Sequence, residues 1–243
     1  MGDFVDLHCH YIPNVDDGVK SQEEGLALCK ALQAIGFGTV VATPHIRTTM
    51  FENNRRDLEA AFSEFQAKAK KESPSLPMLY LAAEHFFDDV FWQRLERDDV
   101  ISYPGQRAIL IEFAYDQWPL NLEHAFFNLQ LRNLTPVLAH PERYSKLFKS
   151  TEPLFALTQQ GVRPLLDVMS LVGKYGRKPQ KAAERMLDEG IYYAACSDAH
   201  KPQHVLLVEK ALGKLQKRVG THAFETLMSI HPRKLLSLPS PLS

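Results

Sequence analysis

Short apolar segments alternate with longer amphipathic segments along almost the whole chain, and this alternation constrains the fold more than any other feature. Helical patterns run from the capping-box residue Ser21 to Gly36 and across 54–71. Such alternation predicts parallel strands joined by right-handed crossovers. Seven apolar runs have the length and the β-branched or aromatic content of strands: 4–8, 39–44, 78–83, 108–113, 135–139, 163–168 and 192–196.

Polar side chains with metal-ligating atoms stand at the ends of these runs. An open α/β sheet binds ligands mainly at one switch point, whereas a barrel brings all its carboxyl-terminal strand ends to one mouth. The sequence therefore predicts an α/β fold, a β/α barrel of about seven parallel strands with its site at the carboxyl ends of the strands. The residues concerned are His8, His10, His45, Glu84, Glu112, His140, Asp198 and His200.

The length of 243 residues suits one domain, 1–243, in which we expect 237–243 to be a loose tail. Lys and Arg total 28 against 29 Asp and Glu, so no basic face for nucleic acid is expected. Cys9, Cys29 and Cys196 are too far apart for a disulfide framework or a CxxC zinc site. No signal peptide and no membrane span are visible, and we expect a cytoplasmic protein without membrane insertion.

Nine residues are candidate metal ligands, and the turn residue Asp17 joins the eight at the strand ends. His8 and His10 have the two-residue period of a strand, which places both rings on one face. A single histidine is more often a hydrogen-bonded structural residue, but Glu84 and Glu112 at apolar strand ends are costly unless paired or metal-bound. Nine nitrogen and oxygen ligands exceed one tetrahedral site. They suit two or three divalent ions and favour zinc, manganese or iron.

The charge of such a site narrows the substrate. Three divalent ions would outweigh four carboxylates, and the remaining positive charge suits a phosphate monoester dianion. Arg47 and Arg143 lie two and three residues past candidate ligands and could hold phosphate. The Cys-x5-Arg loop of cysteine phosphatases is absent from the sequence, and so are a P-loop and a GxSxG elbow.

Six motifs together resemble the polymerase-and-histidinol-phosphatase (PHP) superfamily. Within it they resemble the bacterial tyrosine-protein phosphatases linked to capsule and exopolysaccharide synthesis, because Asp17 and Glu112 stand where many other members have histidine. The motifs are DLHCHYIPNVDDG (6–18), TPHIRTTMF (43–51), AAEHFFDD (82–89), IEFAY (111–115), PVLAHPERY (136–144) and SDAH (197–200).

The resemblance implies a distorted β/α barrel with a trinuclear centre of manganese or iron, with zinc possible. Arg143 in HPERY matches the expected phosphate contact, and Arg47 matches a basic residue near the mouth. Glu84 would bridge two metals. The implied groups are His8, His10, Glu84 and Asp198 for the first metal, Glu84, Glu112 and His140 for the second, and Asp17, His45 and His200 for the third.

The implied activity is metal-dependent hydrolysis of protein phosphotyrosine by a metal-bridging hydroxide, which would regulate bacterial polysaccharide synthesis. The implied partner is a tyrosine-phosphorylated protein, expected to be a bacterial tyrosine autokinase. Two alternatives stay open: a small-molecule phosphatase of the histidinol-phosphate type, and a non-catalytic metal-binding regulatory protein. The sequence leaves the metal, the physiological substrate and the oligomeric state open.

The chain departs from the resembled family after SDAH. Relatives often carry an Arg-Pro-Pro loop there, whereas this chain has no arginine between His200 and Arg218. Lys201 or His204 would replace that arginine only in part, because neither offers a bidentate fork. Asp167 stands where relatives often have asparagine, and the sequence offers no reason for it.

Overall fold

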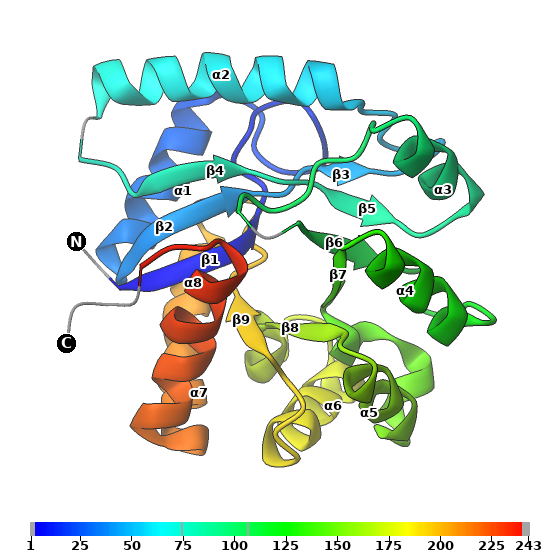
Figure 1. Cartoon of the computed structure of the whole chain (residues 1–243). Helices are drawn as coiled ribbons and strands as arrows, with labels where there is room; N and C mark the ends of the chain where they lie inside the picture. The colour runs from blue at the N-terminus through cyan, green and yellow to red at the C-terminus, as the bar shows by residue number, and fades with distance from the viewer. Residues whose placement is uncertain (1–2, 74, 106, 240–243) are drawn as a thin grey trace.

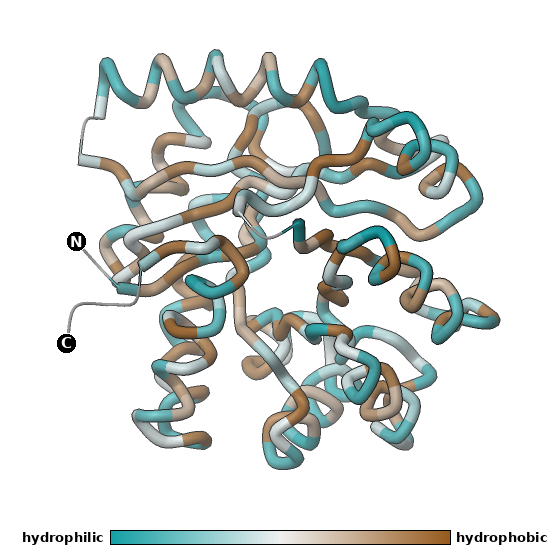
Figure 2. Tube along the Cα trace, viewed as in Figure 1, coloured by the Kyte–Doolittle hydropathy of each residue, from teal (hydrophilic) through white to brown (hydrophobic). Residues whose placement is uncertain are grey.

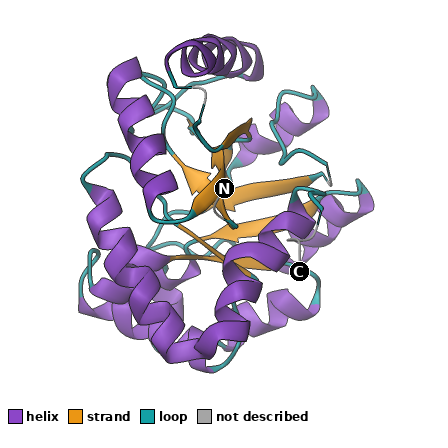
Figure 3. Cartoon of the chain, turned by 90° about the vertical axis from the view of Figure 1, so that its left-hand side faces the viewer, coloured by secondary structure: helices purple, strands orange, loops and turns teal. Residues whose placement is uncertain are grey.

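The computed structural model describes residues 3–73, 75–105 and 107–239. Strands and helices alternate through this range, and the helices surround the strands (Figures 1 and 3). Each pairing between named strands is parallel, which confirms the predicted α/β class. The strands are β1 (Phe4–Cys9), β2 (Phe37–Ala42), β3 (His45–Ile46), β4 (Met78–Leu81), β5 (Glu84–Phe86), β6 (Ala108–Glu112), β7 (Thr135–Ala139), β8 (Arg163–Asp167) and β9 (Ala194–Cys196).

The helices and helical turns connect successive strands. The α-helices are α1 (Gln22–Ala34), α2 (Arg55–Glu72), α3 (Asp89–Glu96), α4 (Leu122–Leu131), α5 (Glu152–Gln159), α6 (Arg177–Asp188), α7 (His204–Glu225) and α8 (His231–Leu235). The 3₁₀ turns are η1 (Pro141–Arg143), η2 (Ser145–Phe148) and η3 (Val168–Val172), and η4 (Thr226–Ile230) is a π-helical turn. Ser21 caps α1 by accepting a hydrogen bond from the Glu24 amide, as the capping box predicts.

The strands form two sheets, one with the order β1-β2-β4 and the other β3-β5-β6-β7-β8-β9. About seven strands were expected, and the described residues contain nine. The expected run 39–44 forms β2 and stops just before the separate β3. The run 78–83 forms β4 and stops just before β5. Each short strand begins with a candidate ligand, His45 or Glu84, so the breaks set these residues apart from the apolar strands before them.

On one side the two sheets are continuous through the chain, because β2 leads into β3 and β4 leads into β5, and two hydrogen bonds extend these parallel pairs. The Ala82 amide donates to the Ala42 carbonyl across 2.8 Å, and the Glu84 amide donates to the Pro44 carbonyl across 3.1 Å. On the other side a parallel bridge joins Cys9 to Ala199, just past β9. Both sheets contribute to an apolar interior, which is made of Val5, Leu7, Val41, Ala82, Tyr103, Ala108, Leu110, Val137, Ala139, Leu165, Ala194, Cys196, Leu235 and Leu236.

Polarity follows this layering. Apolar colouring runs along the central strands, while hydrophilic and apolar residues alternate along the outer helix α2 (Figure 2). Among the described helices, none combines the length and the apolar composition that crossing a bilayer requires. Of the expected tail 237–243, residues 240–243 lie outside the described residues, and Leu238 packs partly buried against the apolar interior.

Candidate metal centre

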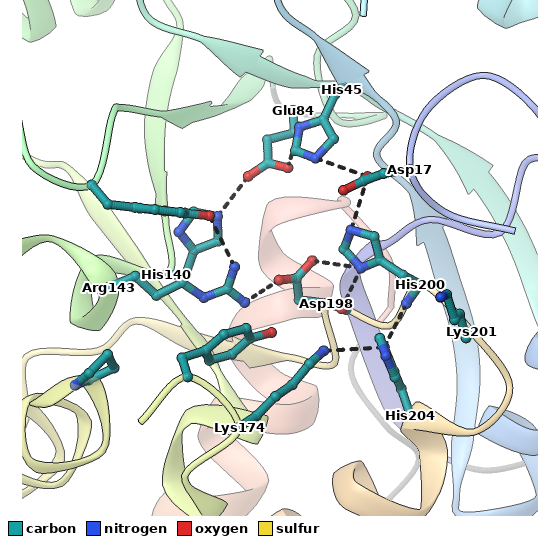
Figure 4. A pocket seen from close by; sticks show the side chains of 13 residues that line it. Asp17, His45, Glu84, His140, Arg143, Lys174, Asp198, His200, Lys201 and His204 are labelled. Atoms are coloured by element: carbon teal, nitrogen blue, oxygen red, sulfur yellow. Dashed lines mark hydrogen bonds and ion pairs between the residues drawn. The ribbon is translucent and has the colours of Figure 1, made fainter. Parts of the chain in front are cut away.

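The nine candidate ligands converge at the carboxyl ends of the strands, and six of them line one cavity (Figure 4). The cavity measures about 590 Å³. His8, His10 and Glu112 are buried beneath its surface. The cavity is lined by Asp17, His45, Glu84, Tyr115, His140, Arg143, Lys174, Tyr175, Pro179, Asp198, His200, Lys201 and His204.

A bulge in β1 brings His8 and His10 into the site. Between Asp6 and Cys9 the register against β2 shifts by one residue, and such an extra residue re-aims the side chains that follow it. Val5 and Leu7 face the apolar interior, whereas Cys9 belongs to the outer core cluster, so the alternation changes after Leu7. His8 then faces the carboxylates. The Nε2 atoms of His8 and His10 lie 3.1 Å apart, and His8 Nε2 lies 3.0 Å from Glu84 Oε2.

Glu84 stands at the middle of the cluster. Parallel pairing places His45 of β3 opposite Glu84 of β5. His45 Nδ1 lies 3.1 Å from Glu84 Oε2 and 3.3 Å from Glu112 Oε1. The other oxygen, Glu84 Oε1, lies 2.9 Å from His140 Nε2. Burial alone would raise the pKa of Glu84, but the neighbouring His8 and His45 outweigh it and hold that pKa well below its usual range.

Asp17 and His200 form the outer part of the cluster. Asp17 Oδ1 lies 3.3 Å from His200 Nε2 and 3.5 Å from His45 Nε2. Its side chain is 56% exposed, so it faces the cavity opening. The neighbouring Asp16 is buried, and its Oδ2 lies 2.7 Å from His10 Nδ1 and accepts from the His45 amide. Asp16, which the sequence analysis passed over, therefore orients two candidate ligands.

Two candidate ligands have a left-handed backbone, His140 with φ 33° and Asp198 with φ 47°. His140 directly follows β7, and Asp198 is the second residue after β9. A non-glycine residue in this region costs on the order of 1–3 kcal/mol, and such strain clusters at functional sites. The surrounding ladder holds it here, since the Asp198 amide donates to the His8 carbonyl and the His140 amide to the Leu165 carbonyl.

The arrangement fits divalent metals. Three groups have ligand atoms within 4.8 Å of one another: His10, Asp17, His45 and His200; His8, His10 and Asp198; His45, Glu84 and Glu112. Glu112 Oε1 and His45 Nδ1 are buried without a hydrogen-bond partner among the described residues. Buried carboxylate oxygens that converge with imidazole nitrogens are the ligand atoms that divalent metals bind. His10 and His45 each belong to two groups, unlike the grouping that the resemblance implies.

Arg143 lies beside this cluster on η1. Its Nη2 pairs with both Asp167 and Asp198, and its guanidinium carbon lies 3.7 Å from the centre of the Tyr175 ring. Nη1 donates to the Tyr115 hydroxyl over 3.4 Å. Asp167 thus has a structural role that the sequence did not reveal: it neutralises Arg143 and also caps η3 through the Met169 amide.

Glu142 fixes the loop that carries His140 and Arg143. Its carboxylate is fully buried and accepts from the Asp167 amide, the Ser170 hydroxyl and the Tyr192 hydroxyl. Burial raises the pKa of Glu142 to about 7. The first two contacts tie the loop after β7 to the end of β8 and to η3, and the third ties it to the segment before β9.

Arg47 stacks on an aromatic ring. Its guanidinium lies 4.2 Å from the centre of the Phe86 ring, and Arg47 is not among the described residues that line the cavity. Its proposed contact with phosphate therefore has no support from its position. Lys174, Tyr115 and Tyr175 do line the cavity but were not singled out, because they lie on loops without a strand-end pattern.

Two curated tyrosine-protein phosphatases are similar to this chain over most of its length. Tyrosine-protein phosphatase YwqE of Bacillus subtilis is 28% identical over 218 residues, covering 89% of this chain and 85% of YwqE. Tyrosine-protein phosphatase CpsB of Streptococcus pneumoniae is 27% identical over 241 residues, covering 96% and 98%.

Solved structures are also similar to this chain in fold. A structure from the crystallographic study of YwqE and CpsB, described as metal-dependent tyrosine phosphatases, has a TM-score of 0.87 at 26% identity and covers 98% of this chain and 99% of its own. An inactive dihydroorotase-like domain from Chaetomium thermophilum, with a TM-score of 0.64 at 12% identity, covers 100% of this chain and 81% of its own and shares the fold alone. The family model for capsular polysaccharide synthesis, CpsB/CapC, matches residues 4–237, and the chain belongs to this family.

Proposed function

We propose that this chain is a metal-dependent phosphomonoesterase that hydrolyses protein phosphotyrosine and thereby regulates bacterial polysaccharide synthesis. The observation that carries the proposal is the convergence of nine histidine and carboxylate side chains beside Arg143 in one cavity. The tyrosine phosphatases YwqE and CpsB, which resemble the chain over most of its length, support the substrate class. Its partner would be a tyrosine-phosphorylated protein, a bacterial tyrosine autokinase.

In this proposal the chain is one domain with a distorted PHP-type β/α barrel that holds two or three divalent ions, manganese or iron. When bound, such ions would lower the pKa of water, polarise the phosphate oxygens and stabilise the leaving oxygen. The residues that hold them are His8, His10, Asp17, His45, Glu84, Glu112, His140, Asp198 and His200.

The protein's other residues orient the substrate. Arg143 is fixed by two carboxylates and stacked on Tyr175, so its remaining N–H groups have a defined direction toward the cavity. Tyr115, with 48% of its surface exposed, stands at the rim where the aromatic ring of a phosphotyrosine would enter. A tyrosine leaving group has a pKa of about 10, so its departure needs no strong general acid.

The test compares kcat/KM for a phosphotyrosine peptide and for histidinol phosphate, on metal-stripped protein reloaded with manganese. We expect a preference for the peptide of more than about tenfold, equivalent to roughly 1.4 kcal/mol in transition-state binding. A preference for histidinol phosphate would replace the proposal with a small-molecule phosphatase. Loaded protein that turns over neither compound but still binds its phosphoprotein would be a regulatory protein.

A further inference from the structure

Lys174 lies on the cavity wall opposite Glu84 and His45, in the loop between η3 and α6 (Figure 4). Gly173 and Gly176 on either side of it have φ of 80° and 95°, so the loop makes a tight excursion that brings the lysine to the cavity. Its Nζ lies 3.2 Å from His204 Nδ1 and 3.6 Å from Met169 Sδ. Among the described residues, no carboxylate is within ion-pair distance of it.

This environment distinguishes Lys174 from Arg143. Arg143 shares its charge with Asp167 and Asp198, so much of its attraction for an incoming anion is already neutralised. Lys174 is half-buried, and its described partners are a thioether, an imidazole and, at 5.1 Å, the face of the Tyr175 ring; each attracts an ammonium more weakly than a carboxylate does. A partly desolvated cation with weak partners is prepared to accept an anionic ligand.

His204 holds Lys174 in this position. His204 Nδ1 accepts from the His200 amide at 3.2 Å, so that nitrogen carries a lone pair, and the same lone pair faces Lys174 Nζ. The Nδ1 lone pair can therefore accept a hydrogen bond from the Lys174 ammonium.

We propose that Lys174 is a phosphate-binding residue of this cavity and that His204 is its positioning residue. The ammonium binds a phosphate oxygen that points away from the carboxylates, and so supplies a second cation in place of the arginine that the chain lacks in the segment after His200. The inference rests on the proposed phosphatase function, and it adds which residues recognise the phosphate dianion.

Lys201 is the competing candidate, since it also lines the cavity. Its side chain is exposed, and among the described residues no hydrogen bond or ion pair orients it. An exposed, unrestrained lysine is well hydrated before it binds a ligand, and it loses its full side-chain conformational entropy on binding. The structure therefore assigns the larger role to Lys174.

The experiment titrates inorganic phosphate into the manganese-loaded protein by calorimetry. We expect Lys174→Met to weaken phosphate binding about tenfold or more, as for the loss of one hydrogen bond to a charged group. Lys174→Arg should stay within about threefold of the parent, since the charge is kept. Lys201→Met should change binding less than Lys174→Met. Lys178→Met, at an exposed position of α6, is the matched control, and this variant should bind phosphate as the parent does.

The role of His204 needs a conservative rescue. His204→Leu removes the acceptor and should weaken phosphate binding by about threefold, whereas His204→Gln offers an amide oxygen and should restore most of it. For phosphotyrosine peptide, both Lys174→Met and His204→Leu should raise KM more than they lower kcat. Metal content, measured on every variant, should equal that of the parent.

The outcomes separate the two proposals. Parent-like phosphate affinity of Lys174→Met, at equal metal content, overturns the inference and leaves the phosphatase standing. An equal or larger loss in Lys201→Met also overturns it. A loaded parent protein that binds no phosphate at all contradicts the proposed function together with this inference.

Discussion

The cavity has two regions of opposite chemistry. One is the ligand cluster, made of the nine candidate metal ligands, in which nitrogen and carboxylate oxygen atoms face one another at 2.9–3.7 Å. The other is the cation wall, made of the cations Arg143 and Lys174 and of Tyr175 and His204, which contact them. The cluster stands mainly on strand ends held by the parallel ladder, whereas the wall stands on η1, on the loop after η3 and on the start of α7.

This difference explains what each region can do. Ladder hydrogen bonds fix the strand ends, so the cluster can keep buried carboxylates close together against their repulsion. The wall needs separate supports, namely Glu142 beneath the η1 loop and His204 beside Lys174. We therefore expect changes in the cluster to remove metal and activity together, and changes in the wall to affect substrate alone.

The largest effect is expected for Glu84→Gln. Its two oxygens contact His8, His45 and His140, so the amide removes the negative charge at the centre of the cluster. We expect loss of bound metal and a fall in kcat/KM of roughly 10³-fold or more, because metal ions provide several kcal/mol of transition-state stabilisation. Metal analysis and peptide kinetics measure both. The exposed Glu123→Gln should leave both unchanged, and full metal content in Glu84→Gln would contradict the grouping.

Arg143→Met tests the wall. We expect kcat/KM for phosphotyrosine peptide to fall by about 10²–10³, the range for losing one electrostatic stabiliser of a transition state. Metal content should stay at the parent value, since Asp198 keeps its contacts with His8 and His10. Arg143→Lys should restore little, because a lysine cannot bridge Asp167 and Asp198 while donating to substrate. Substantial metal loss would show that the two regions are not separable.

Asp16→Asn tests the support of the cluster. The amide should still occupy the site but bind His10 less strongly, so metal affinity should fall about 10–100-fold, as for other partners of metal-binding histidines. Competition with a chelator measures this affinity. Asp116→Asn, at an exposed position, is the control. An unchanged affinity would mean that the ladder alone orients His10.

The sequence predicted the ligand cluster far better than the wall. His8, His45, Glu84 and their partners stand where apolar runs end, and the carboxyl ends of parallel strands meet in space. Only Asp17 of the turn was predicted to be a ligand, and the spacing gave no sign that the neighbouring Asp16 faces inward and contacts His10. The bulge in β1 had no sequence signal either, because it depends on the pairing with β2.

Of the wall, Arg143 was predicted as a phosphate contact, but Lys174 and Tyr175 were not, because loops place them. Arg47 was predicted to hold phosphate on the basis of its distance along the chain from His45, and its side chain stacks on Phe86. Lys174 reaches the cavity through a loop between two glycines with positive φ, a path that periodicity does not reveal. Sequence spacing locates residues on strands well and on loops poorly.

The smallest effect is expected for Tyr115→Phe. The hydroxyl accepts from Arg143 Nη1 at 3.4 Å, which is a long hydrogen bond. Its removal should lower kcat/KM by about twofold to threefold, at the low end for a single hydrogen bond. Peptide kinetics at constant metal loading measure it. A fall comparable to that of Arg143→Met would mean that Tyr115 contacts the substrate phosphate itself.

The central claim is that the ligand cluster supplies the hydrolytic activity. The most direct measurement is kcat/KM for a phosphotyrosine peptide as manganese is added back, equivalent by equivalent, to stripped protein. The account predicts no turnover without metal and a rise that saturates at about two to three bound ions, the number that nine nitrogen and oxygen ligands suit. Turnover that persists after metal removal, or full loading without phosphate release, would contradict it.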